Sequence, residues 1–297
     1  IDGTQNLTVA TGGLTTFDGL VGSTTILGAI DISGTGGLDL DAAITSAASL
    51  AVTGATNLGA NVTTTGAQVY TGTITLDDSG SFTLDSTGND ATDDITTAAI
   101  AGVNGGDAEN LTLDAGVAGA ITIGGTVSDI TNLTITNSDG VNFSSAVTLL
   151  GDLTISNSSS GANIQIGTTA DADLTANDLV TTAKDYDVFI FEDADITAQT
   201  TFLNTGSLTL GSGGGDVLTF IGGLVATNPD QISMSGTINT TNTTMTLGDG
   251  GTGITLTKNT TLSSGSGTIN IAGAMAGAGD NDALIINSTG TTNITAA

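Results

Sequence analysis

A short phrase of alternating apolar and polar residues recurs along the chain and limits the folds open to it. Residues 110–113 read NLTL, residues 132–135 read NLTI and residues 152–155 read DLTI, at spacings of 22 and 20 residues. A second set of alternating phrases, at 121–124, 141–143 and 164–167, lies about half a repeat further on. Alternation with period 2 indicates strands with one buried face. The Gly, Ser, Asn or Asp after each phrase is typical of turns.

A repeat of roughly 20 residues that holds two or three short strands suits one coil of a parallel β-helix. We therefore predict an all-β fold: a right-handed parallel β-helix, a solenoid of roughly 20-residue coils, with residues 1–297 as one domain. At about 4.8 Å per coil, roughly fourteen coils would form a rod about 65–70 Å long. Segments 86–109 and 171–200 have a weaker pattern, and we expect them to be irregular and rich in loops. Segment 41–50, DAAITSAASL, has the highest helix propensity, but we expect a strand and a turn there.

The composition excludes several classes of protein. There are 44 glycines, but hydrophobic residues still make up 38% of the chain, which argues against a disordered linker. Thirty acidic residues face two lysines, Lys184 and Lys258, for a net charge of −28. Such a chain cannot bind nucleic acid by neutralising phosphates, and anionic membranes should repel it. Cysteine is absent, so there is no disulfide framework, and no apolar run approaches the roughly 18 residues of a membrane helix.

Catalysis in a chain without His or Arg would depend on lysine or on paired carboxylates. Three acid pairs stand close in sequence: Asp77 with Asp78, Asp93 with Asp94, and Asp171 with Asp173. Two carboxylates can cleave glycosidic bonds, so a carbohydrate-active β-helix enzyme, a lyase or a glycoside hydrolase, is the alternative function. Sugar sites usually also bring aromatic platforms, and aromatic residues make up only 3% of this chain. We therefore expect no enzymatic activity.

Calcium is the metal that the acidic turns could hold. Residues 211–218, GSGGGDVL, and residues 277–284, GAGDNDAL, approach the Gly-rich nonapeptide of calcium β-rolls, but that motif needs tandem copies. An Asp in a Gly-rich turn is the simpler interpretation, so we expect no resident cofactor, with loosely bound Ca²⁺ as the alternative. The candidate ligands are Asp93, Asp94, Asp216, Asp280 and Asp282.

Segment 184–195, KDYDVFIFEDAD, combines a cation, aromatic rings and acids, unlike the rest of the chain. As an exposed loop it would be an interaction patch of Lys184, Tyr186, Phe189 and Phe191. Alternatively, Val188 and Ile190 belong to a core strand, with Phe189 and Phe191 pointing outward. The residues do not decide between these two interpretations.

Asn-x-Ser/Thr triplets are frequent, for example at Asn110, Asn132 and Asn142. Such triplets can be glycosylated, but NLT is also simply the strand phrase of a Thr-rich chain, which is the interpretation we favour.

The strings AENLTLDAGVAGAITIGGTV (108–127), SDGVNFSSAVTLLGDLTIS (138–156) and NVTTTGAQVYTGTITLDDSGSFTL (61–84) resemble the repeats of filamentous-haemagglutinin-like and autotransporter-like bacterial surface proteins. The resemblance covers most of the chain and implies a parallel β-helix, export to the cell surface and a role in adhesion, surface coats or fibres. The secretion-signal domain and the translocator of that family have no counterpart in this sequence.

We therefore expect a secreted, structural or adhesive element at a bacterial cell surface. Its partners would be further copies of itself, end to end or side by side, or cell-surface glycans, with no nucleic acid and no membrane insertion. The sequence begins and ends within the repeat pattern, so we expect a processed product or a piece of a longer protein. Uncapped β-helices expose unpaired backbone and can stack into filaments.

Overall fold

The computed structural model describes residues 1–77, 80–86, 88, 90–103, 108–167, 173–279 and 282–295. These residues form strands and turns and contain no helix. The strands wind into a parallel β-solenoid of about 12 turns, with coils roughly 23 residues apart. The predicted fold class is confirmed. The coils are longer and fewer than expected, because turns of variable length add residues without adding strands.

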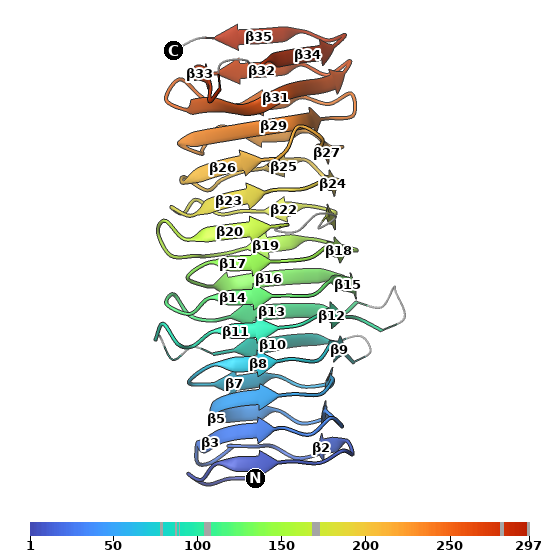
Figure 1. The fold of residues 1–297 in the computed structure, drawn as a ribbon, viewed down its shortest axis with the longest axis vertical. Helices are drawn as coiled ribbons and strands as arrows, with labels where there is room; N and C mark the ends of the chain where they lie inside the picture. The colour runs from blue at the N-terminus through green and yellow to red at the C-terminus, as the bar shows by residue number, and fades with distance from the viewer. Residues whose placement is uncertain are drawn as a thin grey trace. The chain divides into compact units, whose positions relative to one another are not determined.

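The chain divides into two compact units. Unit 1 comprises residues 1–144, 148–151 and 157–159, and unit 2 comprises residues 145–147, 152–156 and 160–297. Within each unit the strands stack in columns, in which a strand pairs with its counterpart one coil away (Figure 1).

Unit 1 has three columns, and its strand pairs are parallel. The first column contains β1 (Leu7–Val9), β3 (Leu27–Ile32), β5 (Ile44–Val52), β8 (Gln68–Tyr70), β11 (Ile95–Thr97), β14 (Ile121–Ile123) and β17 (Val141–Phe143). The second contains β2 (Thr15–Phe17), β4 (Leu38–Leu40), β6 (Thr56–Leu58), β9 (Ile74–Leu76), β12 (Ile100–Ala101) and β15 (Val127–Ile130). The third contains β7 (Val62–Thr64), β10 (Ser81–Asp85), β13 (Asn110–Asp114) and β16 (Asn132–Asn137). Strand β18 (Val147–Leu149) includes residues of both units.

Unit 2 repeats this plan, and two long strands bend from one column into the next. The first column contains β20 (Asn163–Ile166), β23 (Asp187–Ile190), β26 (Ser207–Leu210), the first parts of β29 (Gln231–Asn239) and β31 (Gly253–Gly265), and β33 (Ala274–Gly277). The second contains β21 (Leu174–Ala176), β24 (Ala194–Ile196), β27 (Val217–Phe220), the later parts of β29 and β31, and β34 (Leu284–Ser288). The third contains β19 (Leu153–Ile155), β22 (Leu179–Val180), β25 (Thr200–Thr201), β28 (Leu224–Ala226), β30 (Met245–Leu247), β32 (Ile269–Ala272) and β35 (Thr292–Thr295).

The repeated phrases of the sequence pair with one another in register. Asn110 lies opposite Asn132 and Leu111 opposite Leu133 in the β13–β16 pair, and the half-repeat phrases pair in the same way in β14 and β17. Leu111 and Leu133 point inward and are at most 1% exposed. Burying each such side chain stabilises the fold by roughly 1.5–3 kcal/mol, so each coil adds one more layer to a continuous apolar core.

Asparagine and aspartate side chains on the outside of unit 1 form a polar ladder. Asn132 Nδ2 donates to Asn110 Oδ1 (2.7 Å), and Asn157 Nδ2 donates to Asn137 Oδ1 (2.9 Å). Asn137 Nδ2 in turn donates to both carboxylate oxygens of Asp114, at 3.1 and 3.0 Å. The side chains of neighbouring coils therefore satisfy one another, as stacked amides do in cross-β structures.

The weakly patterned segments are more regular than expected. We expected loops in both segments, but the described part of 86–109 contains β11 and β12, and the described part of 171–200 contains strands β21 to β24 and the first residue of β25. Residues 44–50 of the alanine-rich segment 41–50 belong to strand β5, as predicted. The buried residues Ile44, Ala47 and Leu50 are three apart, because the first part of β5 pairs with β7 and the later part with β8. Their burial outweighs the helix propensity of alanine.

Candidate functional site

Two aromatic rings of unit 2 lie on the outside of the coil. The chain has seven Phe and two Tyr, all within the described residues, and Phe189 and Phe191 are the two that are not buried. Their ring centroids are 5.3 Å apart and the ring planes are inclined by 32°. We call these two residues the aromatic pair.

Strand β23 positions the aromatic pair through simple alternation. Val188 and Ile190 point inward and are 0% and 1% exposed, so Phe189 and Phe191 point to the outer face. This arrangement matches the second interpretation of the segment, a core strand with outward phenylalanines. Burial of the two aliphatic residues fixes the strand, and the rings are carried on its opposite side.

Polar side chains flank one ring and glycines flank the other. Gln165 of β20 and Thr209 of β26 lie in register with Phe189 on the two neighbouring strands, about 4.8 Å away in backbone spacing. The Phe191 N–H donates to the Ile166 carbonyl oxygen (3.0 Å), and the Phe191 carbonyl oxygen accepts from the Ser212 N–H (3.0 Å). The residues next to these partners, Gly167 and Gly211, have φ angles of 76° and 80°, which favour glycine.

Tyr186 does not belong to a surface patch, which corrects the first interpretation of the segment. It is 0% exposed, its Oη donates to the Ile155 carbonyl oxygen (3.2 Å), and it accepts from the Thr182 N–H (2.9 Å). Burial raises the pKa of the Tyr186 hydroxyl. A hydrophobic ring whose hydroxyl finds partners inside the coil gains more from burial than from exposure. Lys184 is exposed in the turn before β23.

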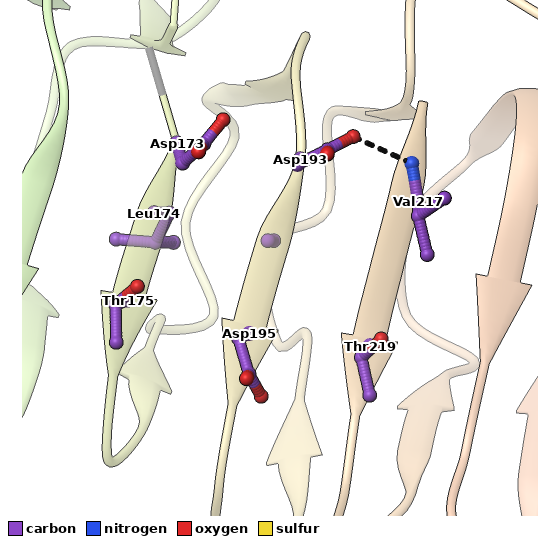
Figure 2. Close-up of a pocket in the computed structure, with 8 residues that line it drawn as sticks. Asp173, Leu174, Thr175, Asp193, Asp195, Val217 and Thr219 are labelled. Carbon is purple, nitrogen blue, oxygen red and sulfur yellow. Dashed lines mark hydrogen bonds between the residues drawn. The ribbon is translucent and has the colours of Figure 1, made fainter. Parts of the chain in front are cut away.

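A small acidic pocket lies on the second column of unit 2, over β21, β24 and β27 (Figure 2). Its volume is about 210 Å³. Asp195 stands in register between Thr175 and Thr219 on the adjacent strands. The pocket is lined by Asp173, Leu174, Thr175, Asp193, Ala194, Asp195, Val217 and Thr219.

The carboxylates of this pocket are exposed, and one of them is engaged with the backbone. Asp193 Oδ1 accepts a hydrogen bond from the Val217 N–H (2.7 Å), which Figure 2 marks. Asp173 and Asp195 are likewise exposed. The sequence paired Asp173 with Asp171, which lies outside the described residues, as does Asp78. None of the lining residues is aromatic.

The calcium candidates of the Gly-rich turns close those turns themselves. Asp216 Oδ2 accepts hydrogen bonds from the N–H groups of Ser212 (2.6 Å) and Gly213 (2.7 Å). Asp282 Oδ2 accepts from the Gly279 N–H (2.6 Å). Turn closure by a side-chain carboxylate is ordinary for Asp. Asp280 lies outside the described residues.

The carboxylates of Asp93 and Asp94 also accept hydrogen bonds from backbone N–H groups. Asp93 is 2% exposed and its Oδ2 accepts from the Asp90 N–H (2.6 Å). Asp94 Oδ1 accepts from the Ala120 N–H (2.8 Å). Across the described ranges, no group of three or more Asp, Glu, His or Cys side chains is placed to hold a metal ion. The expectation of no resident cofactor stays a prediction, with loosely bound Ca²⁺ as its alternative.

A further turn that contains an acidic residue, 248–253, was not singled out from the sequence. Asp249 Oδ1 accepts from the N–H groups of Gly251 (2.7 Å) and Thr252 (3.1 Å) and from Thr252 Oγ1 (3.1 Å). The Gly251 hydrogen bond is the main cause that lowers the pKa of Asp249. Residues of this turn and of turn 227–230 line a pocket of about 160 Å³. The Asp-Gly-Gly sequence is the signal that predicts such a turn.

The asparagines of the strand phrase have structural partners. Asn110 Nδ2 donates to the Ala108 carbonyl oxygen (2.9 Å), and Asn132 Nδ2 donates to Asn110. A glycan would have to replace these hydrogen bonds, which agrees with the interpretation of NLT as a strand phrase.

Comparison with known proteins yields no relatives for this chain. No protein-family model matches the sequence, and neither the curated proteins nor the solved structures gave a match. Within the described residues no helix is long and apolar enough to cross a membrane.

Proposed function

We propose that this chain is a structural and adhesive element of a bacterial cell surface that assembles with further copies of itself by stacking coil on coil. Within each unit, every coil is already a template for the next, because its strands pair in parallel and in register. The resemblance to filamentous-haemagglutinin-like and autotransporter-like repeats supports the extracellular location. Antibodies against the chain should therefore label intact cells.

The observation that carries the assembly proposal is the parallel, in-register pairing of successive coils, and the coil of β33, β34 and β35 shows which side chains such stacking would bury. Ile271 is 2% exposed, whereas Ile294, its register partner in β35, is 60% exposed. Leu262 is 0% exposed, whereas Ile286, its partner in β34, is partly exposed. A further coil in register would bury these side chains, as earlier coils bury theirs.

The coil of β1 and β2 in unit 1 offers a similar surface. Leu7 and Val9 are partly exposed, but their register partners Ile30 and Ile32 are 1% and 0% exposed. The coil of β1 and β2 and the coil of β33, β34 and β35 are different surfaces. A contact between one of them and the other on a second copy would be head-to-tail, and such contacts extend into a filament when they do not close into a ring. Unpaired strand backbone adds to the attraction.

The test is sedimentation velocity combined with electron microscopy of the purified chain, in EDTA and in millimolar Ca²⁺. We expect concentration-dependent assembly into filaments. The double substitution Ile286→Asp, Ile294→Asp should abolish assembly, because a carboxylate would be buried unpaired at each joint. Ile285→Asp is the matched control: Ile285 is 52% exposed on the outer side of the same strand, and assembly should survive its replacement.

Monomers at every protein concentration, in both buffers, would refute this proposal. If assembly requires Ca²⁺, acidic turns would lie at the contacts between copies, which would support the alternative of loosely bound Ca²⁺. Assembly that Ile285→Asp blocks as strongly as the double variant would also contradict coil-on-coil stacking.

A carbohydrate-active enzyme is the second candidate, and the acidic pocket of Asp173, Asp193 and Asp195 is the observation that favours it. Paired carboxylates can cleave glycosidic bonds, but no aromatic residue lines this pocket, so we favour the non-catalytic role. Release of reducing ends from a polysaccharide by the wild-type chain, lost in Asp195→Asn, would reverse this preference.

A further inference from the structure

We propose that the aromatic pair Phe189 and Phe191, with Gln165 and Thr209 beside it, is a binding platform for an uncharged polysaccharide. This inference rests on the proposed adhesive role and names the surface and the ligand class for it. It does not depend on coil stacking, because all four residues lie within unit 2.

Exposure of the pair needs a reason, because the chain buries aromatic rings wherever else it has them. Phe17, Phe82, Phe143, Phe202 and Phe220 are at most 7% exposed, and both tyrosines are in the core. At the equivalent outward position, the adjacent strands place Gln165 and Thr209. Two neighbouring, partly exposed phenylalanines on a polar, acidic surface are therefore a departure from the pattern of this chain, and adjacent apolar groups that reach solvent can mark interaction sites.

The geometry of the two rings suits the face of a sugar ring. A pyranose has an apolar C–H face that packs on aromatic carbon and a rim of hydroxyls that need hydrogen-bond partners. The centroids of Phe189 in β23 and Phe191 just after it are 5.3 Å apart, with the ring planes inclined by 32°. The rings therefore pack against each other and together form one apolar surface on which the C–H face of a sugar could pack.

The neighbours of Phe189 supply hydrogen-bond groups. The Gln165 amide offers two donors and an acceptor, and the Thr209 hydroxyl offers one donor. Both side chains are partly exposed. Next to Phe191, Gly167 and Gly211 are buried and have left-handed φ angles, which favour glycine at both positions.

The charge of the surroundings selects against anionic glycans. Within segment 184–193, Lys184 is the sole cation against Asp185, Asp187, Glu192 and Asp193, and the whole chain carries −28. Uronic acid and sulfated polymers would be repelled. An uncharged polymer of hexoses or pentoses avoids that cost, and several copies in a filament would add avidity to a weak site with Kd on the order of 1 mM.

Affinity electrophoresis in native gels tests the proposal, because this acidic chain migrates fast while an uncharged polysaccharide in the gel does not move. The probes are hydroxyethylcellulose, barley β-glucan and xylan, with heparin and alginate as anionic comparisons. We expect at least one uncharged polymer to retard the wild type by more than twofold. The variant Phe189→Thr, Phe191→Thr, which keeps strand propensity, should lose this retardation.

Two further variants keep the result interpretable. Leu203→Ala removes a side chain that is 38% exposed elsewhere in unit 2, and it should be retarded like the wild type. Phe191→Trp enlarges the aromatic surface and should increase retardation. Circular dichroism and thermal unfolding establish that each variant is folded.

The proposal is overturned if no uncharged polymer retards the folded wild type, or if the double Thr variant is retarded equally. Preference for heparin or alginate would also overturn it. If the double Thr variant loses self-association in sedimentation while glycan retardation is unchanged, the pair is a protein contact and not a sugar platform. Failure of filament assembly alone leaves the gel result unaffected, so the two proposals can be separated.

Discussion

The polar ladder of unit 1 and the aromatic pair of unit 2 lie on coils of the same kind, but their outer side chains differ in what they contact. In both regions, alternating Leu, Ile and Val residues point inward and are almost fully buried. On the outer face of unit 1, Asn110 and Asn132 bond to each other, as do Asn137 and Asp114, so these side chains are engaged within the molecule. On the outer face of β23, the rings instead stand beside different residue types. The core of a coil specifies the fold, and the outer residues are free to differ.

Removal of a core side chain should have the largest effect, and it should be similar in the two regions. Leu133→Ala in unit 1 and Leu208→Ala in unit 2 each remove a leucine that is 0% exposed. We expect the free energy of unfolding to fall by roughly 2–5 kcal/mol in each case. Chemical denaturation followed by circular dichroism measures this. A loss below about 1 kcal/mol at either position would show a core that is less tightly packed than the structure indicates.

Disruption of the polar ladder should lower the free energy of unfolding by an intermediate amount. A matched substitution next to the aromatic pair should lower it much less. Asn137→Ala removes the donor to Asp114 and the acceptor for Asn157. We expect a loss of about 1–2 kcal/mol in the free energy of unfolding, since Asn157 loses this partner and Asp114 keeps only its hydrogen bond from the Gly116 N–H. Thr209→Ala, the matched change on the outer face of β26, should cost less than about 0.5 kcal/mol. Equal losses would remove the distinction between the two surfaces.

The smallest effects concern pH, and here the two units should respond with opposite sign. In unit 1, repulsion by Asp39 is the main cause that raises the pKa of Asp41, followed by burial and by Asp18 and Asp77. A carboxyl whose pKa is raised by folding opposes the fold when it is ionised. Asp41→Asn should therefore raise the melting temperature at pH 7, with the gain disappearing below the ordinary value of 3.8.

In unit 2, Asp249 should show the reverse. Its pKa is lowered by the Gly251 N–H and by Thr252, so its ionised form stabilises the folded turn. Asp249→Asn should lower the melting temperature at neutral pH, and this difference should vanish as the pH falls through the lowered pKa of Asp249. Thermal unfolding of the two variants across the acid range measures both signs. A shift of the same sign for the two variants would contradict the local environments described here.

The candidate site was predictable in part. Alternation in VFIF placed Phe189 and Phe191 outside once Val188 and Ile190 were assigned to the core. The interpretation of segment 184–195 as an interaction patch placed Tyr186 on the surface, and the structure corrects this: its hydroxyl donates to the Ile155 carbonyl oxygen, which belongs to a distant part of the sequence. Local pattern carries no information about such a partner.

The sequence by itself determined the class of fold, because period-2 alternation and Gly- and Asp-rich turns admit short strands with one buried face. It also determined most inward residues and the pairing of the repeated phrases, such as Leu111 with Leu133. Only the tertiary structure decided which outer side chains are neighbours: Gln165 and Thr209 beside Phe189, or Thr175 and Thr219 beside Asp195. The physical reason is that coil length varies with the turns. The register between coils is therefore set by packing of the whole layer, and the surface it creates cannot be read from any one strand.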